Sequence, residues 1–122
     1  MANEITRTAS LQFAKGNVAA VAFSEASKNS NVSGTRYHRT VQQIGTSEEA
    51  LGLGELASLG YCMIKNLDAT NYVEIKTATS GTAFLKLKPG ECALFRFGSG
   101  VTAPFAQANT AAVSIEIMIV ED

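Results

Sequence analysis

The sequence predicts an all-β protein, an antiparallel sandwich or barrel in a single domain that covers residues 1–122. First, Thr, Val and Ile make up about a fifth of the 122 residues, and these residue types favour strands. Second, apolar and polar residues alternate with a period of two, most clearly where Val113, Ile115 and Ile117 are separated by polar residues. Third, turn-forming residues recur roughly every 8–12 positions in the second half, a spacing typical of sandwiches and barrels.

The strands are predicted from this alternation, and we expect about seven to nine of them. Near the N-terminus, two strands flank a turn at Lys15-Gly16-Asn17. The predicted strands lie at residues 5–13, 18–23, 35–44, 61–66, 72–76, 83–88, 92–97 and 113–119.

The connections carry their own signals. Lys88-Pro89-Gly90-Glu91 predicts a type II turn, because Pro presets the first central position and Gly supplies positive φ at the second. In the segment 66–71, Asn66, Asp68 and Asn71 favour a turn capped by side chains. Residues 47–50 look like a helix start, but Gly52 and Gly54 follow, so we expect at most one or two helical turns or an irregular connection there.

The charge balance argues against nucleic acid as a partner, since ten basic residues against eleven acidic ones leave no surplus for a phosphate-binding patch. No membrane span is expected either, because the longest run without a charge, residues 97–115, contains too many polar residues. No signal peptide is visible at the start of the chain, and we therefore expect synthesis and folding in a cytoplasm.

The two cysteines, Cys62 and Cys92, lie in apolar, strand-like runs. We expect two buried free thiols, since cytoplasmic thiols stay reduced. A disulfide would require the two strands to lie side by side, which the sequence does not establish.

The residues that carry chemistry are few. His38 is the only histidine, so a metal site or a triad built on it lacks partners, and a solvated or interface histidine is expected. Glu48 and Glu49 are interpreted as a solvated first turn, and Asp68 as a turn residue in preference to a calcium ligand. We therefore expect no enzyme activity, no catalytic residue, no cofactor, no metal and no small-molecule substrate.

Two strands look apolar on both faces. In residues 92–97, Cys92 and Leu94 oppose Ala93 and Phe95, and residues 61–66 show the same pattern. Outer faces of small sandwiches are normally wet, so a second apolar face favours a subunit interface. The alternative is that these are central strands partly covered by loops.

The C-terminal half resembles small structural proteins of tailed phages. The resemblance rests on turn and strand patterns at residues 59–75 (LGYCMIKNLDATNYVEI), 84–91 (FLKLKPGE), 108–113 (ANTAAV) and 117–122 (IMIVED), and residues 1–50 have no part in it. Among such proteins, the chain is most similar to capsid decoration (cement) proteins. The resemblance implies a jelly-roll-like antiparallel β-sandwich, and it carries over no functional residues.

The resemblance implies a non-enzymatic virion protein, made in the host cytoplasm, that decorates and stabilises the outer surface of an icosahedral phage capsid by bridging its subunits. The implied partners are the major capsid protein and, in a homotrimer, two further copies of the chain. Residues 1–10 are expected to form an N-terminal arm or an edge strand. The alternatives are a neck or tail component of the virion, and a β-sandwich module that binds carbohydrate or a receptor.

Overall fold

The computed structural model describes residues 4–122, apart from the side chain of Val18, and confirms the all-β, antiparallel prediction. The described residues contain no helix, so none in that part of the chain is able to cross a membrane. The chain divides into two compact units, Met1–Ser33 and Gly34–Asp122. Each unit is described by itself below.

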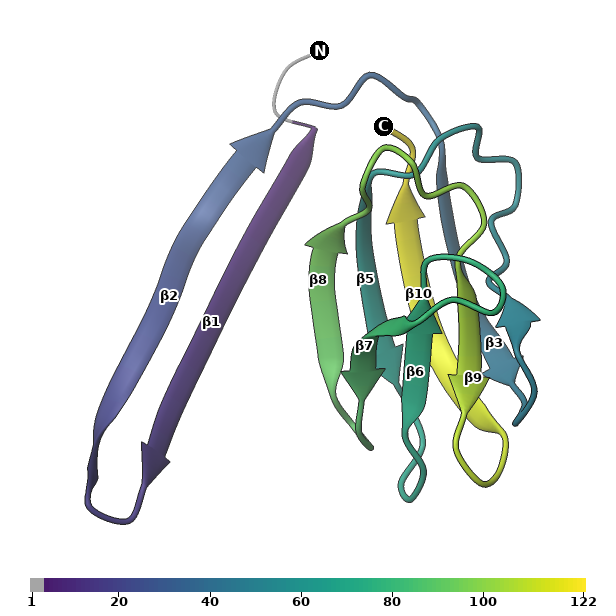
Figure 1. Ribbon diagram of the computed structural model, residues 1–122. Coiled ribbons are helices and arrows are strands. Elements are labelled where there is room, and N and C mark those ends of the chain that lie inside the picture. The colour runs from purple at the N-terminus through teal and green to yellow at the C-terminus, as the bar shows by residue number, and fades with distance from the viewer. Residues whose placement is uncertain (1–3) are drawn as a thin grey trace. The chain divides into compact units, whose positions relative to one another are not determined.

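The N-terminal unit is one long β-hairpin. It consists of β1 (Ile5–Lys15) and β2 (Val18–Ser30), which pair antiparallel around a turn where Gly16 has a φ of +54° (Figure 1). The pairing shifts register between Arg7 and Ala9 and again near the turn. Both strands and their turn were predicted, but β2 continues seven residues past the predicted end at residue 23.

The C-terminal unit contains two four-stranded antiparallel sheets (Figure 1). The first sheet has the order β3-β10-β5-β8, and the second has the order β4-β9-β6-β7. The strands are β3 (Tyr37–Ile44), β4 (Glu49–Ala50), β5 (Tyr61–Asn66), β6 (Val73–Lys76), β7 (Ala83–Leu87), β8 (Cys92–Arg96), β9 (Phe105–Ala108) and β10 (Val113–Val120).

The hydrophobic core lies where the two sheets face each other. Strand β10 shows the alternation of buried and exposed residues most clearly: Ile115, Ile117 and Ile119 are fully buried, whereas the residues between them are partly or fully exposed. Val73 and Ile75 on β6 are buried in the same cluster from the second sheet. Alternation along each strand therefore assigns one face of each sheet to the core.

The turn at Asn66 is built by side chains, as predicted. The Asn66 side chain is fully buried: its Nδ2 donates to the carbonyl oxygens of Asn71 (2.9 Å) and Leu87 (3.0 Å), and its Oδ1 accepts from the Asp68 amide (2.8 Å). The Asp68 carboxylate accepts amide hydrogen bonds from Asn71 and Thr70, which lower its pKa. These contacts connect the last residue of β5 to the segment just before β6.

The second predicted turn is also confirmed. The Glu91 amide donates to the Lys88 carbonyl oxygen (3.0 Å), and Gly90 has a φ of +79°. A positive φ at this position is the reason that the turn requires glycine.

The structure differs from the sequence prediction at two connections. Of the two alternatives for residues 47–50, the helical one is wrong: the connection is irregular apart from the two-residue strand β4, Glu49–Ala50, which pairs with Ala106 and Phe105 of β9. Strand β9 was not predicted. Its sequence, FAQA, carries no β-branched residue, and pairing with β6 on its other side fixes it as a strand.

The expectation of a single domain over residues 1–122 stays a prediction; within the described residues, the chain groups into the two compact units given above. Residues 5–10, which fall within the expected arm, form the first part of β1, and residues 1–3 lie outside the described residues.

Candidate interaction surface

The outer face of the β3-β10-β5-β8 sheet carries a row of apolar side chains. Met63 on β5 lies opposite Met118 on β10 and Leu94 on β8, so the three side chains form a continuous row across three strands. All three are exposed, and Met63 exposes 48% of its surface. The strands that looked apolar on both faces thus have one face toward the core and one exposed face.

Aromatic and charged side chains flank this row. Tyr37 on β3 is exposed and pairs with Val120, and Tyr61 on β5 pairs with Arg96. The Arg96 guanidinium lies 4.5 Å from the centre of the Tyr61 ring, and its Nη1 is 3.0 Å from Asp122 Oδ2. The apolar row is therefore bordered by charge, as in the rim of a protein interface.

A further ion pair lies beside Met118. Arg39 Nη2 is 2.7 Å from Glu116 Oε2, and both side chains are exposed. An exposed pair contributes little stability, so its effect here is to place two charges directly beside the apolar row. Lys65 and Val41 complete this side of the outer face, and both are exposed.

The outer face of the other sheet is different in kind. Glu74 on β6 lies opposite Lys86 on β7 and Gln107 on β9, so polar groups occupy the centre of this face. Lys76 Nζ is 2.7 Å from Glu48 Oε1, and this hydrogen bond, with one from the Ser80 amide, lowers the pKa of Glu48 to about 2. The centre of this face is thus polar, with Phe84 exposed on β7 beside Lys86, whereas the centre of the other face is apolar.

The hairpin carries a second exposed apolar face. Leu11 lies opposite Phe23, and Phe13 lies opposite Val21, so these four side chains share one face of β1 and β2. All four are exposed, with Leu11 at 74% and Phe23 at 76%. The opposite face presents small or polar residues, with Ser10 opposite Ser24 and Gln12 opposite Ala22.

The cysteines differ from the prediction in one respect. Both are free, but only Cys62 is buried, and Cys92 is exposed on the outer face. Strands β5 and β8 do lie side by side, yet Cys62 pairs with Phe95 and Cys92 pairs with Lys65, so the two thiols point to opposite faces of the sheet. Burial raises the pKa of Cys62 to about 12, which leaves Cys92 as the accessible thiol.

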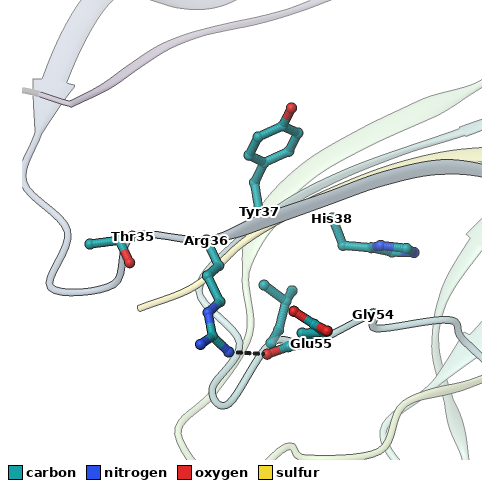
Figure 2. Close-up of a pocket in the computed structure, with 7 residues that line it drawn as sticks. Thr35, Arg36, Tyr37, His38, Gly54 and Glu55 are labelled. Carbon is teal, nitrogen blue, oxygen red and sulfur yellow. Dashed lines mark hydrogen bonds between the residues drawn. The ribbon is translucent and has the colours of Figure 1, made fainter.

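His38 lies in β3 next to a hollow of about 410 Å³. The hollow is lined by residues 35–38 and 54–56, and Arg36 Nη1 donates across it to the Glu55 carbonyl oxygen, 2.9 Å away (Figure 2). The His38 ring packs against Gly54, where an added Cβ would lie 2.7 Å from Nδ1. Within the part of the chain that the structure describes, no three His, Cys, Asp or Glu side chains gather as metal ligands would. The contacts of His38 are those of a packed side chain.

Comparisons with protein-family models, with curated proteins and with solved structures found no match to this chain. The exposed apolar faces are therefore the features on which a functional hypothesis rests.

Proposed function

We propose that the protein is a non-enzymatic structural component of a virion that binds the outer surface of an icosahedral phage capsid and stabilises it by bridging capsid subunits. The observation that carries the proposal is the contrast between the two outer faces of the C-terminal unit. The first face has an exposed apolar row at its centre, formed by Met63, Met118 and Leu94, whereas the centre of the second face is occupied by Glu74, Lys86 and Gln107. A protein that sits on a shell needs one face for its partners and one face for water.

The strand order supports a jelly-roll sandwich for the C-terminal unit. Counting β3 as the first of eight strands, one sheet reads first-eighth-third-sixth and the other reads second-seventh-fourth-fifth. This is the order that results when two Greek keys are folded into two facing sheets, an architecture common in viral capsid proteins. The same architecture occurs in lectins and cupins, so the fold agrees with a capsid-binding role but does not by itself distinguish it from those functions.

The mechanism in this proposal is burial of surface. A copy that contacts two capsid subunits at once binds a surface that exists only in the assembled shell, so binding stabilises that state by mass action. Many copies on one particle add their effects through multivalency. A homotrimer presents three such contacts together, which is the reason that we expect a trimer as the functional unit.

A neck or tail component uses the same kind of surface and is the second structural candidate. The carbohydrate-binding alternative draws less support from the site: in the hollow beside His38, the Tyr37 ring points away from Gly54 and Glu55 and offers no platform for a sugar there (Figure 2).

The test is microscopy of the parent particle, combined with mass spectrometry of its proteins. We expect copies of the chain in the particle and density for its two-sheet unit in a regular array on the outside of the head. Density confined to the neck or tail would replace head decoration with the second candidate. Absence of the chain from purified particles would refute both.

A further inference from the structure

We propose that the apolar face of the hairpin, formed by Leu11, Phe13, Val21 and Phe23, docks on the outer face of the β3-β10-β5-β8 sheet of a second copy. The inference deepens the proposed function, because it rests on the self-association proposed above and names the two surfaces that meet. It does not depend on the capsid, so each idea can fail without the other.

The hairpin needs a covering partner. A two-stranded hairpin is marginally stable in water, and independent stability requires further strands or packing of an apolar face. Leu11 and Phe23 are paired side chains that expose about three quarters of their surface, and Ser10 and Ser24 behind them supply no second core. Exposed apolar side chains on long strands favour aggregation, so proteins usually cover them with another surface.

The sheet face of a second copy fits the hairpin in size. The outward-facing residues of β5, from Tyr61 to Lys65, span about 13 Å at the usual rise per residue. The apolar part of β1, from Ala9 to Phe13, spans about 13 Å at the usual rise per residue. A hairpin laid along β5 therefore matches it in length, and its two strands lie side by side over the row of Met118, Met63 and Leu94.

The charges on the two faces are complementary. Glu25 follows Phe23 by two positions on β2, and Lys65 follows Met63 by two positions on β5, so each charge lies one step beyond the apolar cluster on the same face. Neither has an ion-pair partner within residues 4–122. Docking that places Phe23 over Met63 brings the carboxylate of one copy toward the ammonium of the other.

The area is sufficient when the contact repeats. Phe13 and Phe23 are 50% and 76% exposed, and with Leu11 and Val21 they offer on the order of 450 Å² of apolar surface, given the usual area of large side chains. A single contact of this size lies at the weak end of specific interfaces. In a ring, each copy gives one hairpin and receives one, so each copy makes two contacts. Such a contact joins two different surfaces and is heterologous, and a rotation of 120° between neighbouring copies closes it into the proposed trimer.

The first experiment measures molar mass by light scattering in solution, without any capsid. We expect about 39 kDa for the wild type, three times the chain mass of 12.9 kDa. Phe23→Asp puts a charge into the apolar face, and we expect it to give the mass of one chain. Ala22→Asp is the matched control, because Ala22 is exposed on the opposite face of the same strand, and we expect it to keep the wild-type mass.

The second experiment uses the native thiol of Cys92, which is exposed on the sheet face and pairs with Lys65. Glu25→Cys places a thiol at the docking edge of the hairpin, and Ser24→Cys places one on its other face as the control. Under mild oxidation, we expect Glu25→Cys to give linked dimers and higher species on a non-reducing denaturing gel, well above the yield of Ser24→Cys. Circular dichroism of each variant verifies that the sheets remain folded.

Three outcomes would overturn the inference. The first is a wild type that stays monomeric at millimolar concentration. The second is a trimer that Phe23→Asp and Ala22→Asp leave equally intact, which would place self-association on another surface and leave capsid binding open. The third is a Glu25→Cys disulfide formed within single chains, which would show that a copy covers its own sheet.

Discussion

Replacing Asn66 with Ala is expected to destabilise the C-terminal unit by about 2–4 kcal/mol. The amide makes three hydrogen bonds in the core, to the carbonyl oxygens of Asn71 and Leu87 and from the Asp68 amide, and it is fully buried. Each bond contributes about 1 kcal/mol net, and each buried group that loses its partner costs about 1–3 kcal/mol. Water entering the new space would satisfy some of these groups, which sets the lower end of the range.

The assay is urea unfolding followed by far-UV circular dichroism, since the chain contains no tryptophan. A fall in the urea midpoint with an unchanged slope would report a loss of stability alone. Asn71→Ala is the matched control. The half-buried Asn71 side chain accepts a hydrogen bond from Thr110 Oγ1 (2.7 Å) and also hydrogen-bonds the Asp68 carboxylate, and we expect its loss to cost about 1 kcal/mol.

A loss of less than about 1 kcal/mol for Asn66→Ala would contradict the reasoning, because it would mean that the buried amide is replaced without cost. Equal losses for the two variants would contradict it as well, since the argument depends on the difference between a fully buried and a half-buried side chain.

Three further predictions concern the rest of the chain. Gly54→Ala is expected to lower the free energy of unfolding in urea by more than about 1 kcal/mol, because the residue has a φ of +58° and the new Cβ would contact the His38 ring. Adding His38→Ala should restore part of this stability, and no restoration would contradict the contact. In the Phe23→Asp variant, which is expected to be monomeric, a thiol reagent such as Ellman's reagent should modify Cys92 quickly and Cys62 only on unfolding. Fast modification of both thiols would disprove the burial of Cys62. The folded pKa of Glu48, about 2, lies below its ordinary value of 4.5, so the carboxylate stabilises the fold above about pH 4.5 and this effect is lost as the pH falls toward 2. Glu48→Gln should therefore be less stable than the wild type at neutral pH, with a stability difference that shrinks between pH 4.5 and 2. A difference that stays constant with pH would refute the assignment.

Local patterns in the sequence determined most of the strands and turns. The alternation in β10 identified both the strand and its buried face, because three isoleucines at every second position leave no other amphipathic arrangement. The turn at Gly90 followed from residue chemistry alone, since Pro and Gly restrict φ before any tertiary contact forms. Asn66 and Asp68 signalled a turn for the same reason.

The sequence was less informative where pairing partners decide the structure. Strand β9 has no β-branched residue, and the two-residue strand β4 is too short to carry a period, so both exist because neighbouring strands hydrogen-bond to them. The face of Cys92 was also undetermined, because Cys92 and Leu94 are nearly as apolar as Ala93 and Phe95 on the other side of the strand.

The candidate surface divides in the same way. The sequence by itself determined that the strands of Met63 and Leu94 carry two apolar faces, which favoured a subunit interface over strands covered by loops. Only the tertiary structure decided that these two strands are neighbours with Met63 opposite both Leu94 and Met118, and that the apolar side chains form one row. Likewise, the pairing of Leu11 with Phe23 turned separate apolar residues into one face of the hairpin. The physical reason is that periodicity fixes which side of its own strand a residue occupies, whereas the order and register of the strands set the surface that it shares with others.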